Sequence, residues 1–334
     1  MRTAPRPIPP IAWAGLILGV GIVSILIGLL AGPWGALGAL VIAGLSVAFL
    51  SWRSSARWRA RRMTLSTAFP EAWRTVLRQW CHHYNRLSDD LRARFEDDVR
   101  IFSAEKPVNG VGVEVTEELR LLVAASAVTL SLGWPAYDWE QLKEVLLYPD
   151  DFDRDYEFGA DDFSGQAHPW GTVILSVPAL CQSFRNPDHA YHVGFHEFAH
   201  LLDLEQARFD GIPLGLDDAA AHRWVELRER EIPRMLRGES VLDEYGAHDP
   251  VEFLGVAVEA FFQTSLALRR NNRELYELLA AYFSQDPAAW DDARGLTQES
   301  PIRPHPPRHR RYHDPRRPRP RQSGWGNRGR KQTG

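Results

Sequence analysis

The residues His196-Glu197-Phe198-Ala199-His200 form an H-E-x-x-H pattern inside an apolar stretch with helical spacing. Residues four apart lie on one face of a helix, so the two imidazoles can bind the same Zn²⁺ ion. Glu197 follows the first histidine and can accept a proton from water that such a metal ion activates. The pattern therefore predicts metal-assisted hydrolysis of an amide bond, with one zinc ion as the cofactor.

Two histidines on a surface helix would give the same pattern without any metal. Here Phe195, Phe198 and Leu201 make the segment too apolar for a fully exposed helix. Partly buried imidazoles need a partner, and a metal ion would supply one. His192 lies on the same face, but it is about 12 Å from His200 along the helix axis. We therefore expect His192 to line the site or pack beside it.

A catalytic zinc site needs a third protein ligand and leaves one position open for water. A histidine six residues after the second ligand is ruled out, because that position is Gln206. Glu226 and Glu229 are within range, but they belong to a highly charged segment. The third ligand is therefore expected further along the chain.

The apolar helix predicted to start at Asp249-Pro250 carries two glutamates, Glu252 and Glu259. Buried carboxylates on such a helix need a cation or a hydrogen-bond donor. They are about 10 Å apart along the axis, so only one can bind the metal ion. Glu252 also sits where a capping-box glutamate would bond the backbone. Spacing alone leaves the choice between the two open.

The segments that position these residues predict an α+β fold, mostly helical, with a small β-sheet. The strand at 172–177 is β-branched, lies shortly before the histidines and is expected to line the cleft. Cap residues and apolar periodicity predict the other elements. They are a strand at 145–148 and helices starting at Thr116, from Asn186 to about Glu205, and over 222–236, 253–268 and 273–283.

Charge is distributed unevenly over the 334 residues. Residues 1–62 carry seven arginines and no acid, and residues 301–334 carry 11 basic groups against Asp314 alone. The segment between them carries 21 basic and 42 acidic groups, a net charge of −21. The two cysteines rule out a disulfide framework and lack the spacing of a structural zinc site, which favours a reducing compartment.

The N-terminal segment lacks charged residues from Pro7 to Ser51. At 1.5 Å per residue it is about 68 Å long if helical, so it divides into two membrane spans, about 11–31 and 35–50. Basic flanks at 1–10 and 51–62 favour a hairpin with both ends in the cytoplasm. A single span with an external catalytic domain is the alternative, and it would place the arginines on the unfavourable side.

The C-terminal segment 301–334, rich in proline and arginine, is expected to be disordered. It could contact anionic lipid or nucleic acid, or act as a solvated, solubilising tail. The catalytic domain is therefore expected over residues 63–300. A protein of this organisation would lie at the inner membrane, with the domain and both termini facing the cytoplasm.

Four separated motifs between residues 65 and 295 resemble the Mlc titration factor A (MtfA) family of zinc-dependent peptidases. They are residues 143–149, 171–176, 195–203 and 243–253. The resemblance implies that the zinc ligands are His196, His200 and Glu252, that Glu197 is the general base, and that Tyr245 is an active-site tyrosine. A phenol at this position could donate to the oxyanion.

Two further acids are candidates for supporting roles beside these ligands, although Asp203 could equally be an acid on the helix surface. Glu259 matches a family glutamate and could hold a ligand histidine by its other nitrogen, and Asp203 is a similar candidate. The family implies aminopeptidase-like action on short peptides. The alternative that it implies is a regulatory protein that sequesters Mlc, a transcriptional repressor, with hydrolysis secondary.

Overall fold

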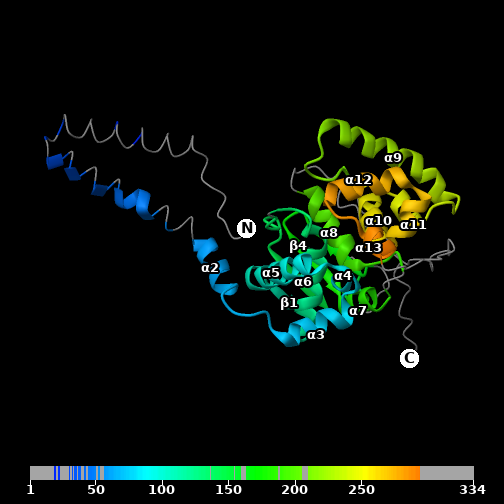
Figure 1. The fold of residues 1–334 in the computed structure, drawn as a ribbon, viewed down its shortest axis with the longest axis horizontal. Coiled ribbons are helices and arrows are strands. Elements are labelled where there is room, and N and C mark those ends of the chain that lie inside the picture. The colour runs from blue at the N-terminus through cyan, green and yellow to red at the C-terminus, as the bar shows by residue number, and fades with distance from the viewer. Residues whose placement is uncertain are drawn as a thin grey trace, which may run out of the picture.

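The computed structural model describes residues 56–293, except 136, 154, 159–162, 187–188 and 205–209, and scattered positions between 19 and 52. The fold is α+β and mostly helical, as the sequence predicts, with one four-stranded sheet (Figure 1). Ten helices and strands precede the H-E-x-x-H segment in the described residues: α2 Ala56–Thr64, α3 Glu71–Trp80, α4 His82–Arg86, α5 Asp89–Glu105, β1 Val108–Gly110, α6 Glu117–Ser131, β2 Glu144–Tyr148, β3 Gly165–Ala167, β4 Thr172–Ser176 and α7 Val177–Arg185.

The H-E-x-x-H segment lies on α8, Val193–Leu204. The described elements that follow are α9 Asp218–Leu236, the 3₁₀ helix η1 Glu244–Ala247, α10 Pro250–Gln263, α11 Ser265–Asn271, α12 Arg273–Phe283 and α13 Pro287–Ala293. Every residue of α8 is buried. This helix is therefore a central element of the core rather than a surface helix.

The sheet has the strand order β1-β2-β4-β3. β1, β2 and β4 are parallel, and β3 pairs antiparallel with β4, with Gln166 opposite Ile174. β3 is thus an edge strand, and it lies against α8. The sequence prediction assigned the cleft to the segment that forms β4. That strand does contact α8, but the edge strand β3 contacts the histidine helix more extensively. The prediction missed β3 because its three residues, Gly-Gln-Ala, have little β-propensity.

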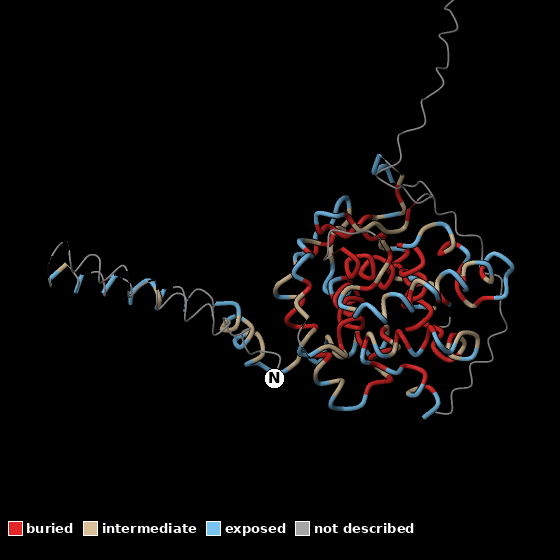
Figure 2. The backbone as a smooth tube through the Cα atoms, turned by 90° about the horizontal axis from the view of Figure 1, so that it is seen from above, coloured by how far each residue is buried: buried red, intermediate tan, exposed pale blue. Residues whose placement is uncertain are grey.

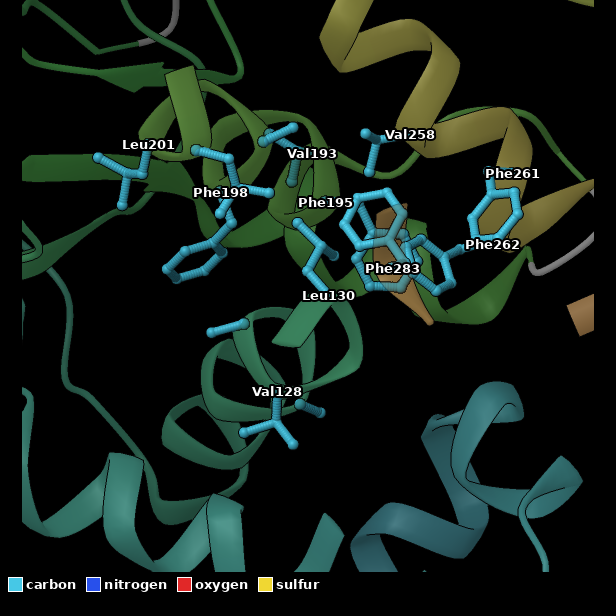
Figure 3. Close-up of a cluster of buried hydrophobic side chains, with 14 of the residues drawn as sticks. Val128, Leu130, Val193, Phe195, Phe198, Leu201, Val258, Phe261, Phe262 and Phe283 are labelled. Carbon is cyan, nitrogen blue, oxygen red and sulfur yellow. The ribbon is translucent and has the colours of Figure 1, made fainter. Parts of the chain in front are cut away.

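The core that holds α8 is rich in aromatic and aliphatic side chains from α6 and α10. Figure 3 shows Phe195 and Phe198 of α8 beside Val128 and Leu130 of α6 and the phenylalanines near the end of α10. Burial follows the same arrangement, with buried backbone in the centre of the body and exposed residues around it (Figure 2). Packing on both sides leaves α8 little freedom to shift, because interiors are close-packed.

Several elements agree with the sequence predictions. Thr116 caps α6 by accepting from the Leu119 amide, and Asp249 caps α10 by accepting from the Val251 amide. The strand at 145–148 and the helix at 273–283 are also present. α9 starts at Asp218, four residues before the predicted start, and contains Pro233.

The predicted helix start at Asn186 is wrong. Asn186 is the C-cap of α7, a helix capped by the Ser176 hydroxyl that the sequence prediction did not include. α8 begins only at Val193, where the Nδ1 atom of His192 accepts from the Phe195 amide. The helix predicted over 253–268 is also interrupted: α10 ends at Gln263, and α11 turns away from it by 115°.

The predicted membrane hairpin and the basic tail lie largely or wholly outside the described residues. The described positions between Gly19 and Trp52 are helical, and Gly32, at the predicted turn, has a φ of 74°. Within the described part of the chain, no single helix combines the length and apolarity of a bilayer span. The bent pair α10 and α11 has the length and apolarity of a span only when the two helices are counted together.

Candidate metal centre

His196, His200 and Glu252 bring potential ligand atoms to within 4.8 Å of one another. The two histidines lie one turn apart on α8, and Glu252 lies in the first turn of α10. His196 Nε2 is 2.9 Å from Glu252 Oε2, and His200 Nε2 is 3.8 Å from Glu252 Oε1. Two imidazole nitrogens and one carboxylate oxygen are a donor set typical of catalytic zinc, so these residues fit that ion.

Glu259 lies on the far side of the His196 ring, two turns after Glu252 on α10. Its Oε2 atom is 3.6 Å from His196 Nδ1, and its Oε1 atom accepts from the His192 amide at 2.9 Å. The structure therefore places Glu252 and Glu259 at opposite nitrogens of the same imidazole. Glu259 also links α10 to the residue that caps α8.

The general-base candidate Glu197 is buried beside the edge strand β3. The Ala167 amide of β3 hydrogen-bonds to its carboxylate. A Cβ atom built on Gly165 would lie 2.6 Å from Glu197 Oε1, so only glycine fits at that position of β3. Glu197 therefore has a defined position between α8 and the open edge of the sheet.

Burial and neighbouring charges set the titration of these groups. Burial raises the pKa of Glu197 to about 8, and the carboxylates of Glu252 and Glu259 add to the rise. Burial alone would lower the pKa of His196, but Glu259 and Glu252 raise it well above the ordinary value. Burial lowers the pKa of His200 to about 4. The two carboxylates that flank His196 therefore favour the protonated form of its ring.

Tyr245 lies on η1, next to the metal centre. Its ring centroid is 6.1 Å from that of His196, and its side chain hydrogen-bonds to Glu252. Asp243 caps η1 and accepts from the Tyr245 amide at 2.9 Å. The phenol therefore reaches the same carboxylate that faces both histidines.

Asp203 lies in α8 after the histidines, and the structure does not bring it to the ligand set. Its Oδ2 atom accepts from the Gly211 amide at 3.0 Å. Burial raises the pKa of Asp203 to about 7. Within the described residues, His200 Nδ1 has no hydrogen-bond partner. Asp203 thus fixes the backbone at Gly211, after α8, and does not hydrogen-bond to His196 or His200.

The sequence prediction did not identify Gly255, which lets α10 approach α8. A Cβ atom at Gly255 would lie 2.5 Å from Cε1 of the His196 ring. A glycine inside an apolar helix lowers the stability of the helix. Its presence in the sequence therefore indicated that the backbone at this position packs closely against another element. His192 was expected to line the site or pack, and it does stack on Phe195, but it also caps α8.

Comparison with known proteins agrees with this geometry. Residues 55–284 match the family model Peptidase_M90, described as glucose-regulated metallo-peptidase M90. The protein slr2042 of Synechocystis sp. is 27% identical over 282 residues, which are 80% of this chain and 96% of that protein.

Several relatives carry the name Mlc titration factor A. The protein from Serratia proteamaculans is 28% identical over 200 residues, which are 55% of this chain and 74% of that protein. The protein from Yersinia enterocolitica is 26% identical over 217 residues, or 59% of this chain and 80% of that protein. The family model matches more than half of the chain, including the residues of the candidate metal centre. The chain is therefore related to Mlc titration factor A proteins and belongs to the M90 family of glucose-regulated metallo-peptidases.

Proposed function

We propose that this protein is a zinc-dependent peptidase with His196, His200 and Glu252 as ligands and Glu197 as general base. The observation that carries the proposal is the convergence of the three ligand atoms within 4.8 Å in a buried site. When bound, Zn²⁺ would lower the pKa of a water molecule and polarise the scissile carbonyl group.

Glu197 would accept a proton from water and pass it to the leaving amine. Its raised pKa suits both steps, because a base with a pKa near the working pH can take up and release the proton. Glu259 would keep the His196 ring oriented from Nδ1. Tyr245, whose side chain hydrogen-bonds to Glu252, would donate from its hydroxyl to the negative charge that develops on the carbonyl oxygen.

The open edge of β3 supports an extended peptide as the substrate. The His168 amide donates to Thr172 and the Ser176 amide donates to Ser164, so these residues pair toward β4. Backbone direction alternates along a strand, so the peptide groups of Gly165 and Ala167 face the other edge, where the Ala167 amide hydrogen-bonds to Glu197 and the carbonyl groups are left to pair with a peptide. The acidic body favours a free or basic amino end, in line with aminopeptidase-like action.

Metal removal tests the dependence on zinc. We expect a chelator to abolish hydrolysis of short peptides by the purified full chain, and stoichiometric zinc to restore it. Restoration should need more zinc as the pH falls, because the proton on His196 competes with the metal ion. Hydrolysis that continues at full rate in a sample shown to be metal-free would contradict the proposal.

Repressor binding is the second candidate function, because several relatives are named Mlc titration factor A. The partner would then be an Mlc-like transcriptional repressor, and hydrolysis would be secondary. The two functions separate when metal-free protein is tested for both. Repressor capture that survives chelation would support a binding role independent of the metal centre.

We also propose that residues 11–50 tether the catalytic domain to the inner membrane from the cytoplasmic side. Support comes from exposed apolar side chains at described positions of that segment, including Leu30, Trp34 and Leu45. We expect the full chain to sediment with membranes and a chain lacking residues 1–55 to stay in the supernatant. Equal sedimentation of both chains would contradict the tether.

The basic segment 301–334 would add contact with anionic lipid. Deletion of this segment should weaken the binding of the protein to anionic vesicles at low salt, and added salt should reduce the difference.

A further inference from the structure

A turn at residues 137–142 connects α2, the first helix after the predicted membrane segment, with the helix that carries the histidines. On one side of the turn, Arg57 and Arg61 of α2 form ion pairs with Asp138 at 3.2 and 2.8 Å. Both arginines also pair with Glu105 at the end of α5, at 2.6 and 2.5 Å. α2 has no buried residue, and this ion-pair cluster joins it to α5 and to the turn.

On the other side of the turn, the Trp139 ring packs against Phe198, which lies inside the H-E-x-x-H sequence. The two ring centroids are 5.1 Å apart at an interplanar angle of 66°, an edge-to-face contact. Phe102 contacts the same phenylalanine, with ring centroids 6.1 Å apart. Phe198 directly follows Glu197, so its ring helps to set the rotation of α8 about its own axis.

Trp139 is held in an unfavourable backbone conformation. Its φ is 49°, in the left-handed region that bulky residues rarely adopt. Lys106 stabilises this conformation by donating from Nζ to the carbonyl oxygens of Trp139 at 2.6 Å and Leu142 at 3.1 Å. The indole is 4% exposed. Strain of this kind persists where the surrounding contacts over-determine the position.

We propose that Trp139 is a positioning residue for the metal centre, and that the Arg57–Arg61 cluster on Asp138 and Glu105 keeps it in place. The physical reason is that a small rotation of α8 about its axis displaces the side chains that the helix carries. A side-chain atom about 5–6 Å from the helix axis moves about 1 Å when the helix rotates by about 10°. A misplacement of about 1 Å can cost about 100-fold in rate. The helix next to the predicted membrane segment is then part of the catalytic unit. This inference rests on the proposed peptidase function.

The first test replaces Trp139 in the full chain by alanine or phenylalanine. We expect Trp139→Ala to lower kcat by about 10- to 100-fold with little change in KM, because the general base moves while the substrate edge stays. Zinc should remain stoichiometric. Trp139→Phe should recover most of the rate, because it restores an edge-to-face contact with Phe198.

Trp134 provides a matched control. Its Nε1 atom donates to the Tyr282 carbonyl at 2.7 Å, and its ring stacks on Phe283 of α12. It also contacts Tyr137, whose ring centroid is 4.9 Å from those of both Trp134 and Trp139, so it matches Trp139 in surroundings but packs on α12 rather than on α8. Trp134→Ala should lower Tm as Trp139→Ala does, but leave kcat near the wild-type value. Equal kcat losses in the two variants, or a wild-type kcat in Trp139→Ala, would overturn the positioning role.

The second test addresses α2. Arg61→Glu and Glu105→Arg should each lower kcat, and the double variant should recover part of it by restoring the pair with reversed charges. An absence of recovery, with both single variants folded, would overturn the role of the cluster.

A readout without catalysis separates this inference from the proposed function. With Co²⁺ in place of zinc, the visible absorption reports the ligand geometry. We expect that spectrum to change in Trp139→Ala and not in Trp134→Ala, even if no form of the protein hydrolyses peptides. Identical spectra for wild type and Trp139→Ala would overturn the inference, whatever the outcome for peptidase activity.

Discussion

Glu197→Gln is expected to lower peptide hydrolysis by about 10²- to 10⁴-fold, the contribution typical of a general base. Glutamine has nearly the same shape and can still face the Ala167 amide, but it cannot accept the proton of water. Zinc content and fold should stay unchanged, because Glu197 is not one of the three converging ligands. The measurement is kcat/KM for a short peptide, with metal content and circular dichroism from the same samples.

Glu96→Gln is the matched control for loss of a buried carboxylate. Glu96 lies on α5, where it accepts from Tyr84 at 2.6 Å and pairs with Arg74 of α3 at 2.9 Å. That variant should lose stability and keep its kcat/KM. A Glu197→Gln protein that hydrolyses peptides at the wild-type rate would remove Glu197 from the proposed mechanism. Loss of hydrolysis with repressor capture retained would show that the two candidate functions are separable.

Glu252→Ala and Glu259→Ala are expected to have different effects on metal binding, although the two residues lie on one helix. Glu252→Ala should lose stoichiometric zinc and hydrolysis together, because its carboxylate faces both histidine Nε2 atoms. Glu259→Ala should still bind zinc, with an affinity about 10- to 100-fold lower, because it removes only the partner of His196 Nδ1.

The measurement is zinc affinity by competition with a chromophoric chelator, in folded protein. Asp203→Asn is a useful comparison from the same region. Asp203 accepts from Gly211, so this variant should keep its zinc affinity and lose stability. If Glu259→Ala lost zinc and Glu252→Ala retained it, the ligand assignment would have to be exchanged.

Much of the fold could be predicted from local signals in the sequence. Thr116 and Asp249 cap helices because their side-chain oxygens satisfy free amides in the first turn, which depends on neighbours only. The same reasoning failed at Asn186-Pro187. There Ser176 already starts α7, and the buried His192 replaces an ordinary cap for α8. A cap pattern indicates a possible helix start, and tertiary contacts decide whether it is used.

For the metal centre, the sequence by itself determined the pairing of His196 with His200 and the place of Glu197 beside them. These three residues share about one turn of one helix, so helical geometry alone brings them together. The sequence also limited the third ligand to two glutamates on one helix. Spacing could not choose between them, because both lie on one face of an apolar helix, and only the family resemblance pointed to Glu252.

Only the tertiary structure placed Glu252 at the Nε2 atoms of both histidines, Glu259 at Nδ1 of His196, and β3 beside Glu197. That placement depends on where α10 crosses α8, and Gly255 sets the distance because any side chain there would collide with the His196 ring. It also depends on Glu259 bonding the His192 amide 67 residues away in the chain. Contacts between distant residues come from packing the whole core, and packing leaves no periodic signal in the sequence.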